Sequence, residues 1–264
     1  MVKLTINGVD CYYGSTKVLE SVSFKVQNGD FVGVIGPNGS GKTTLLRCIC
    51  GVLKPKTGVV LIDNYDIESL TRREIAQHIA VVPQESYVGF NFKVLDVVLM
   101  GRNPHIKTFG SESKKDLEVV YRAMKLTGIL HLADRFITDI SGGEKRRVII
   151  ARALAQEPNV LLLDEPTIHL DINHQIEIMD LLKKLCSKKE LAIIAVFHDF
   201  NLASKYCDKI LMLSNGRIIS LGSPEEVITE NNIQKVFNVK VLVERHPSTG
   251  FLYVVPLHVT KSEA

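Results

Sequence analysis

Residues 31–44 read FVGVIGPNGSGKTT, an apolar run that passes directly into a glycine-rich loop ending in lysine and threonine. The next residues, LLRCICGVL (45–53), have a helical pattern, so the loop connects a strand to a helix. Gly36, Gly39 and Gly41 let the backbone turn so that successive N–H groups point inward at phosphate oxygens, and the helix N-terminus adds its positive dipole end. This stretch predicts a phosphate-binding loop for a nucleoside triphosphate.

Side chains of the same loop have predicted roles. We expect Lys42 to reach the β and γ phosphates and the Thr43 hydroxyl to bind Mg²⁺. A glycine-rich turn with a solvated lysine is the alternative, but it does not require both residue types in this setting. The predicted nucleotide-binding residues of the loop are Gly36, Pro37, Asn38, Gly39, Ser40, Gly41, Lys42, Thr43 and Thr44.

A second buried strand ends in two acidic residues, in the sequence VLLLDEP (160–166). Adjacent strand residues point in opposite directions, so these two carboxylates cannot share one role. We expect Asp164 to bind Mg²⁺ and Glu165 to orient and polarise the attacking water. A solvated strand end is the alternative for such a pair alone; together with the phosphate loop, the pair favours a catalytic site.

The N-terminal region has short β-rich runs at Lys3–Ile6, Val18–Val26 and Phe31–Ile35, separated by the turn signals Asn7-Gly8 and Asn28-Gly29. This pattern predicts an antiparallel sheet that leads into a buried strand.

The apolar runs Val160–Leu163 and Leu191–Phe197 each follow a helical pattern, as strands of a parallel sheet do. We therefore predict an α/β fold: a P-loop NTPase core with a mixed sheet, an N-terminal antiparallel β subdomain and an inserted helical subdomain. The predicted catalytic core comprises residues 1–87 and 158–264, including a C-terminal extension, and the helical subdomain comprises residues 88–157.

Helical patterns dominate the insertion, at Lys93–Met100, Ser113–Thr127 and from Ser141 onward. After Gly222, Ser223 and Pro224 predict the start of the first of two short helices.

Composition excludes several classes of protein. The net charge of +3 comes from charges spread along 264 residues, which gives no indication of nucleic-acid binding. Five cysteines without CxxC spacing favour reduced thiols over disulfides or a zinc cluster. No apolar run approaches the ~18 residues that span a bilayer, so any membrane role is expected to come through a partner.

A second helix start resembles an anion site. In ISGGEKRRVIIARAL (140–154), Ser141 can cap the helix while Gly142 and Gly143 leave its first N–H groups bare. With LLLDEPTIHLD following, the sequence resembles the ATP-binding cassette (ABC) family, and the segment looks like that family's signature motif. Ile140 and Glu144 stand where the family usually has Leu and Gln.

This resemblance implies an ATP-dependent head-to-tail homodimer. Ser141 and Gly143 of one copy are expected to touch the γ-phosphate held by the loop of the other, with Gly142 and Glu144 in the same motif. Asp171 matches the residue whose loop crosses the dimer interface.

Other positions match the family singly. Tyr13 matches the aromatic that stacks on adenine, although neighbouring Tyr12 leaves the register open by one. Gln84 matches the glutamine that links the Mg²⁺ site to the helical subdomain, and we count it among both the catalytic and the metal-binding candidates. His198 matches the histidine that contacts the γ-phosphate. Two further histidines near the dimer loop, His169 and His174, are interpreted as surface or interface residues.

The resemblance also implies partners: permease subunits in the membrane, an extracytoplasmic substrate-binding protein, and a location at the cytoplasmic face of the membrane. A permease helix is expected in a groove near Gln84–Asp96, where Phe90, Phe92 and Val94 line the groove or belong to the core. VLMGRNPHIKTFG (98–110) and VFNVKVLVERHPSTGFLYVVP (236–256) are similar to the importer branch for iron chelates, haem and cobalamin, with molybdate and tungstate importers as near relatives.

Two other classes of protein compete with a transporter ATPase. A soluble ABC ATPase that acts on nucleic acid or ribosomes normally has two cassettes or a long coiled coil, and neither pattern is present in this sequence. A non-hydrolysing regulatory module is expected to lack Lys42, Ser141 or Glu165, and all three are present.

Overall fold

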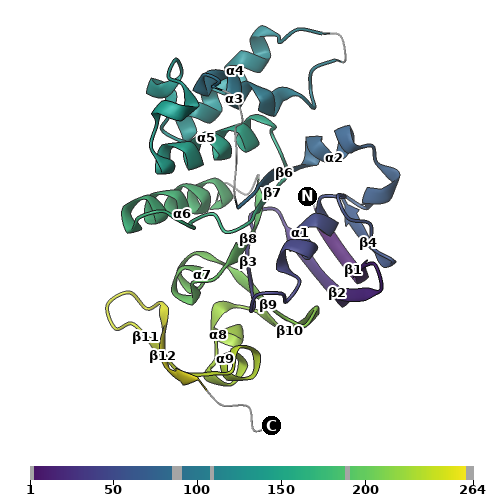
Figure 1. Cartoon of the computed structure of the whole chain (residues 1–264), viewed down its shortest axis with the longest axis vertical. Coiled ribbons are helices and arrows are strands. Elements are labelled where there is room, and N and C mark those ends of the chain that lie inside the picture. The colour runs from purple at the N-terminus through teal and green to yellow at the C-terminus, as the bar shows by residue number, and fades with distance from the viewer. Residues whose placement is uncertain (1–2, 85–90, 108–109, 188–190, 260–264) are drawn as a thin grey trace.

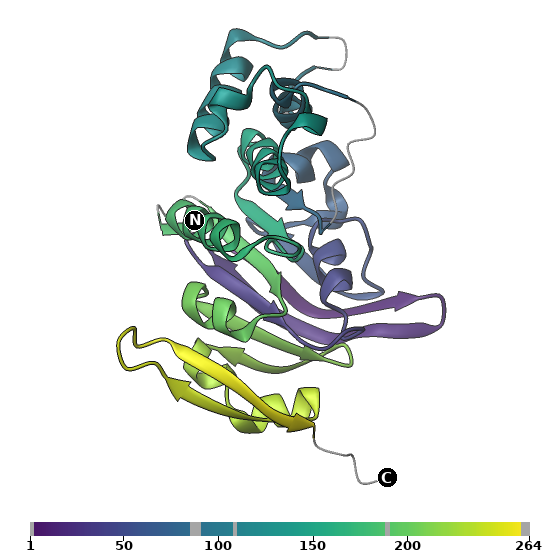
Figure 2. The ribbon, with the colours of Figure 1, turned by 60° about the vertical axis from the view of Figure 1, so that its left-hand side comes forward.

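The computed structural model describes residues 3–84, 91–107, 110–187 and 191–259. A sheet with helices on both faces lies at the centre of the molecule, as Figure 1 shows. A group of helices lies at one end of the long axis and a two-stranded hairpin at the other, and Figure 2 shows the long antiparallel strands crossing beside the central sheet. This arrangement confirms the predicted α/β fold.

The central sheet is mixed. Its β3 strand pairs in parallel with β8 and β9, the parallel order continues from β8 through β7 to β6, and β10 pairs antiparallel with β9 at the edge. Its strands, in spatial order, are β10 (Arg217–Gly222), β9 (Lys209–Ser214), β3 (Phe31–Ile35), β8 (Ala192–Phe197), β7 (Val160–Leu163) and β6 (Ile79–Val82).

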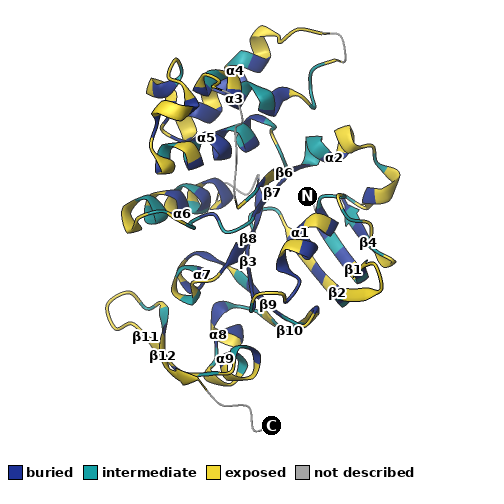
Figure 3. Cartoon of the chain, in the orientation of Figure 1, coloured by how far each residue is buried: buried dark blue, intermediate teal, exposed yellow. Residues whose placement is uncertain are grey.

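The two faces of this sheet belong to two apolar clusters. Phe31 and Ile35 of β3 point into one cluster, and Val32 and Val34 point into the other, because successive strand residues alternate in direction. Strands covered on both faces are apolar throughout, and the central strands in Figure 3 are accordingly buried.

Several helices flank the sheet, including α1, α2, α6 and α7. The helix α1 packs with the second cluster, and the buried side chains of α6 and α7 belong to the first cluster. These helices are α1 (Lys42–Ile49), α2 (Arg72–His78), α6 (Ile172–Ser187) and α7 (Phe200–Tyr206), and a 3₁₀ turn, η1 (Ile67–Ser69), precedes α2.

The N-terminal antiparallel sheet has the spatial order β2 (Thr16–Gln27), β1 (Lys3–Tyr13), β4 (Thr57–Ile62) and β5 (Tyr65–Asp66). The predicted turn at Asn28-Gly29 is confirmed, with Gly29 at φ +82°. The predicted turn at Asn7-Gly8 is wrong, because β1 continues through it with a register shift, and the Gly8 N–H donates to Ser23 Oγ at 2.8 Å. A positive φ at Gly8 produces a bulge in a paired strand here.

Helices and loops form the described part of the segment between β6 and β7, apart from one isolated bridge between Lys93 and Phe136. The three predicted helices are confirmed, with Ser113 and Ser141 as N-caps. Its elements are α3 (Val94–Leu99), η2 (Met100–Arg102), α4 (Lys114–Leu126), η3 (Leu130–Leu132), η4 (Ile137–Asp139) and α5 (Gly142–Ala155). Their apolar side chains join the first cluster of the central sheet, so the domain bounds at 88 and 157 stay predictions.

The C-terminal region contains the two predicted short helices, α8 (Pro224–Val227) and α9 (Glu230–Phe237), with Ser223 capping the first. A hairpin of β11 (Val239–Arg245) and β12 (Leu252–Val259) follows and was not predicted. Among the described residues, no helix has both the length and the apolar character needed to cross a bilayer.

Candidate nucleotide-binding site

The glycine-rich loop connects the end of β3 to the first residue of α1. Gly41 is the N-cap of α1 at φ +104°, and no side chain caps this helix start. A Cβ on Gly36 would lie 2.2 Å from the Leu213 carbonyl oxygen and 2.7 Å from Ser40 Oγ, so only glycine fits beside β9. The first N–H groups of α1 are therefore left for a ligand that approaches from the loop.

Lys42 folds back over this loop. Its ammonium group donates to the carbonyl oxygens of Gly36 at 2.8 Å and Pro37 at 2.9 Å. Burial lowers the pKa of Lys42, while the nearby carboxylates of Glu165 and Asp164 oppose that shift. The lysine charge thus lies within the curve of the loop, where phosphate oxygens would also gather.

Asp164 lies beside the loop at the end of β7. Its Oδ2 accepts a hydrogen bond from Thr43 Oγ1 at 3.1 Å. Its Oδ1, like Ser40 Oγ, is buried without a hydrogen-bond partner among the described residues. Burial raises the pKa of Asp164, and the nearby cations Lys42 and Arg47 oppose that shift. A buried, unsatisfied carboxylate oxygen next to a threonine hydroxyl fits Mg²⁺, which prefers oxygen ligands.

Glu165 is held between two other predicted residues. Its Oε1 lies 2.6 Å from His198 Nε2, and its Oε2 accepts a hydrogen bond from Gln84 Nε2 at 3.0 Å. The three residues follow β6, β7 and β8, which are neighbours in the sheet, so their carboxyl ends meet at one edge. Glu165 also has a φ of +49°, a left-handed conformation that residues other than glycine rarely adopt. The structure therefore brings the predicted catalytic residues together; Gln84 as a Mg²⁺ ligand stays a prediction.

The two neighbouring tyrosines lie in different surroundings. The Tyr13 hydroxyl accepts a hydrogen bond from Arg47 Nη1 at 3.1 Å, and Arg47 belongs to α1, the helix that follows the phosphate loop. The Tyr12 ring instead lies beneath the ammonium groups of Lys56 at 4.6 Å and Lys17 at 5.9 Å. The Tyr13 hydroxyl is therefore bonded to the helix that follows the phosphate loop, and adenine stacking by Tyr13 stays a prediction.

The second predicted anion site, at the start of α5, is capped by its own residues Ser141 and Glu144. Ser141 Oγ accepts from the Glu144 N–H at 3.3 Å, and Glu144 Oε2 accepts from the Ser141 N–H at 2.8 Å. Hydrogen bonds that the backbone and the side chain of Ser141 make with the carboxylate lower the pKa of Glu144. Gly142 is exposed and has open space where a Cβ would stand. A ligand can therefore approach Ser141 and Gly142 from solvent.

Gly143 is covered by a residue that sequence reasoning treated as surface or interface. A Cβ on Gly143 would lie 2.4 Å from the His174 ring. His174 Nδ1 lies 2.8 Å from Asp171 Oδ1, which also accepts from the His174 N–H at 2.9 Å. The His174 imidazole thus connects Asp171 to α5, which is called the signature helix from here on. The spacing of Asp171 and His174, three residues apart at a helix start, was the available signal. His169 is exposed, at φ +60°.

Comparisons with known proteins identify relatives of this chain. The family model described as ABC transporter matches residues 19–168. The chain is 42% identical over 254 residues to the cobalamin import ATP-binding protein BtuD of Halobacterium salinarum, covering 96% of this chain and only 63% of that relative's length. It is 38% identical over 245 residues to the ferric enterobactin transport ATP-binding protein FepC of Escherichia coli, covering 93% and 90%.

A solved structure described as an inward-facing metal-chelate type ABC transporter has a similar fold. It superposes with a TM-score of 0.86 at 30% identity, and the match covers 97% of this chain and 98% of the other. Together with the relatives' names, this similarity confirms the family that the sequence motifs predict.

Proposed function

The chain belongs to the ABC transporter family, and from this premise we propose that it is the ATP-hydrolysing subunit of an importer, bound to a separate permease at the cytoplasmic face of the membrane. The observation that carries the proposal is the placement of Glu165 between His198 and Gln84, beside the phosphate loop. Hydrolysis of ATP needs a group that orients and polarises water next to a triphosphate, and this edge of the sheet has one.

Each residue near the phosphate loop has a chemical role in this proposal. Lys42 and the loop N–H groups bind the β and γ phosphates. Thr43 and Asp164 would hold Mg²⁺, which neutralises phosphate charge when bound. Glu165 orients the water and accepts its proton, and each carboxylate oxygen has a second lone pair beyond its bond to Gln84 or His198. His198 keeps Glu165 in place and contacts the γ-phosphate.

A second copy of the chain supplies the other half of each site in this proposal. Support comes from Ser141 and Gly142, which are exposed at the start of α5. The test is the solution mass of Glu165→Gln with ATP and Mg²⁺, measured by light scattering. We expect a dimer that dissociates when ATP is removed or when Ser141 is changed to arginine. A monomer that binds ATP under all of these conditions would contradict the shared site.

We place the permease in a groove lined by α2 and η2, and the groove predicted near Gln84–Asp96 stays a prediction because residues 85–90 lie outside the described residues. Val94 is fully buried in the core, so it cannot line a groove, and Phe90 lies outside the described residues. Phe92 is exposed. A cavity of about 650 Å³ lies between α2 and η2, lined in part by Val52 and Ile75. Val52 is 74% exposed, as an unpartnered docking residue would be.

Cross-linking tests this docking position. Val52→Cys should form a disulfide with a cysteine series in a cytoplasmic permease helix, and Leu221→Cys on the exposed edge of β10 should not. Equal cross-linking from both positions would remove the groove from the proposal.

We propose a metal chelate, such as cobalamin or a ferric siderophore, as the transported compound. The relatives' names support this class, with haem chelates in the same branch and molybdate or tungstate as the alternative. Reconstituted with its permease and an external binding protein, the subunit should hydrolyse ATP faster when the binding protein carries a metal chelate. Stimulation by molybdate alone would favour the alternative, and failure to co-purify with any multi-span protein would favour a soluble ATPase.

A further inference from the structure

Arg146 is buried although it is charged, and it lies five positions after Ser141 in α5. A guanidinium group has five N–H donors, and five main-chain oxygens receive hydrogen bonds from it at 2.6 to 3.3 Å. Nε donates to Pro166 O, Nη1 to Pro83 O and Gln84 O, and Nη2 to Asp164 O and Glu165 O. One side chain therefore joins α5 to two strand ends.

The charge on this side chain is retained. Burial lowers the pKa of Arg146 to about 10, so the group is protonated at neutral pH. A buried cation is costly unless its donors are satisfied, and carbonyl oxygens satisfy them here. A shorter or neutral side chain at this position would leave several buried carbonyl groups without a donor.

The five carbonyl groups belong to the backbone that carries the water-activating residue. Pro83 and Gln84 follow β6, and the other three follow β7. Glu165, the middle residue of that second group, has the left-handed φ of +49°. Hydrogen bonds to its own carbonyl and to those on either side hold this turn, and the turn directs the Glu165 side chain toward Gln84 and His198.

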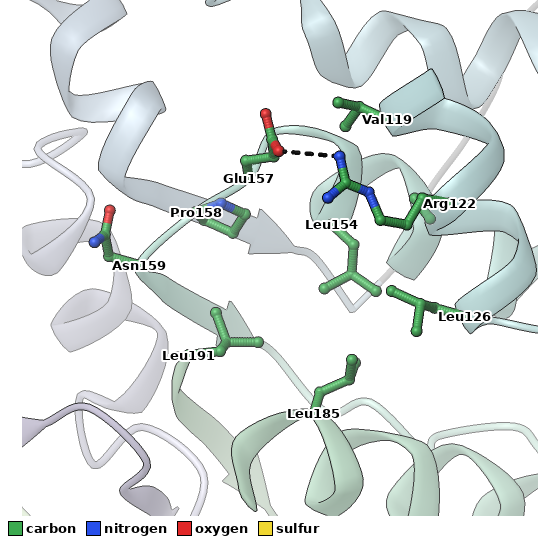
Figure 4. Close-up of a pocket in the computed structure, with 10 residues that line it drawn as sticks. Val119, Arg122, Leu126, Leu154, Glu157, Pro158, Asn159, Leu185 and Leu191 are labelled. Carbon is green, nitrogen blue, oxygen red and sulfur yellow. Dashed lines mark ion pairs between the residues drawn. The ribbon is translucent and has the colours of Figure 1, made fainter. Parts of the chain in front are cut away.

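The two ends of α5 contact the core differently. Its 14 residues span about 20 Å. Near its start, Arg146 connects it to the strand ends. Near its end, a cavity of about 420 Å³ separates α4 and α5 from α6, and Figure 4 shows Leu154 facing Leu185 and Leu191 across it. The start of α5 is therefore joined to the catalytic edge through Arg146, and its end borders a cavity on the α6 side and is joined to β6 by the bond from Gln156 Nε2 to Ile79 O at 2.7 Å.

We propose that Arg146 is a positioning residue that couples the signature helix to Glu165 and Gln84. A shift of the helix start at Ser141–Glu144 moves the guanidinium, and the guanidinium moves the carbonyl groups that set the direction of the Glu165 carboxylate. This inference rests on the proposed ATPase function of Glu165.

The first experiment compares Arg146→Met with Arg147→Met. Arg147 is the next residue of α5 and donates to Thr127 O at 3.0 Å and to Glu177 at 2.5 Å, away from the strand ends. We expect Arg146→Met to lower kcat for ATP hydrolysis about 10- to 100-fold, because a displacement of about 1 Å has effects of this size. Its affinity for a fluorescent ATP analogue should stay within about threefold, and Arg147→Met should keep kcat within about twofold.

A double-mutant cycle separates positioning from general stability. If Arg146 acts through Glu165, Arg146→Met should lower kcat no more than about twofold in a Glu165→Gln background. A purely structural role would lower kcat by the same factor in both backgrounds. Equal factors, or a normal kcat for Arg146→Met alone, would overturn the proposal.

Two further measurements keep the outcomes distinct. If Arg146→Met lacks a cooperative thermal transition, Arg146→Lys takes its place; its three donors cannot meet five carbonyl groups, so we expect a 3- to 10-fold lower kcat with unchanged ATP affinity. A wild-type kcat in Arg146→Lys would then overturn the proposal. Absence of Mg²⁺-dependent hydrolysis in the wild-type protein would instead refute the ATPase function itself.

Discussion

The two glycine-containing helix starts of this protein differ in what they leave unsatisfied. At α1, Gly41 provides no side-chain cap, and Ser40 Oγ and Asp164 Oδ1 are buried nearby without partners among the described residues. At α5, Ser141 and Glu144 cap one another. Both starts present N–H groups and a positive dipole end, but only the first has polar groups that need a ligand.

This difference shows which start is a complete binding site. The phosphate loop gathers its lysine, its Mg²⁺ candidates and Glu165 within one chain, so we expect it to bind ATP alone. The signature start is stable without a ligand and presents mainly a serine and an exposed glycine to solvent. It is therefore suited to contact a nucleotide that is already bound to another protein molecule.

The largest effect is expected at the catalytic carboxylate. Glu165→Gln should lower the turnover of ATP by about 10² to 10⁴, the usual contribution of a positioned base, and leave ATP affinity within about threefold. Phosphate release and binding of a fluorescent nucleotide measure the two quantities. Near-normal hydrolysis would assign water activation to a different group.

The second-largest effect is expected in ATP affinity, when one lysine at each of the two helix starts is replaced. Lys42→Ala should weaken ATP binding by the isolated subunit about 10- to 100-fold, because charge-assisted hydrogen bonds to phosphate are lost. Lys145→Ala, an exposed lysine in the first turns of α5, should change this affinity less than about twofold. Calorimetric titration gives both affinities. An equal loss of affinity from the two substitutions would contradict the proposal that the phosphate loop binds ATP alone.

A third test addresses the contact between the signature helix and His174. Gly143→Ala places a methyl group 2.4 Å from the imidazole ring, so the ring must move and its pair with Asp171 should break. We expect about a tenfold lower ATPase rate with unchanged ATP affinity of the isolated subunit. Removing the ring in Gly143→Ala/His174→Ala should restore part of the rate. A double variant as slow as the single one would show that the clash is not the cause.

The smallest effect concerns the acid stability of the signature cap. Bonds from Ser141 lower the folded-state pKa of Glu144, so this carboxylate stabilises the protein above its unfolded-state pKa of about 4.3. That contribution is lost as the pH falls through the lower folded-state pKa. The difference in urea midpoint between wild type and Glu144→Gln should therefore shrink from pH 6 to pH 3, from at most the ~1 kcal/mol typical of a cap. A difference independent of pH would contradict the carboxylate's role.

Sequence patterns predicted the local elements of the site well. The strand before the loop, the helix after it, the acidic strand end and the Ser141 cap all lie where their residues indicate. The sequence patterns gave a wrong prediction where pairing with distant segments of the backbone determines the local conformation. Asn7-Gly8 has the composition of a turn, yet pairing with two other strands keeps β1 extended through it.

Long-range contacts were also beyond the sequence patterns. Arg146 has the same place in a helical pattern as any polar residue, and its five acceptors come from segments 18 to 63 positions away. The contact of His174 with Gly143 likewise joins two helix starts that no spacing connects.

The sequence by itself determined the phosphate loop and the family, because each is carried by contiguous residues: Gly36 to Thr44 for the loop, and ISGGEKRRVIIARAL (140–154) with LLLDEPTIHLD for the family. Only the tertiary structure decided which side chains meet around Glu165. Gln84 is 81 positions away and His198 is 33 positions away, and parallel pairing of β6, β7 and β8 brings their carboxyl ends to one edge. Strand order is set by packing of the whole core, which no short segment encodes.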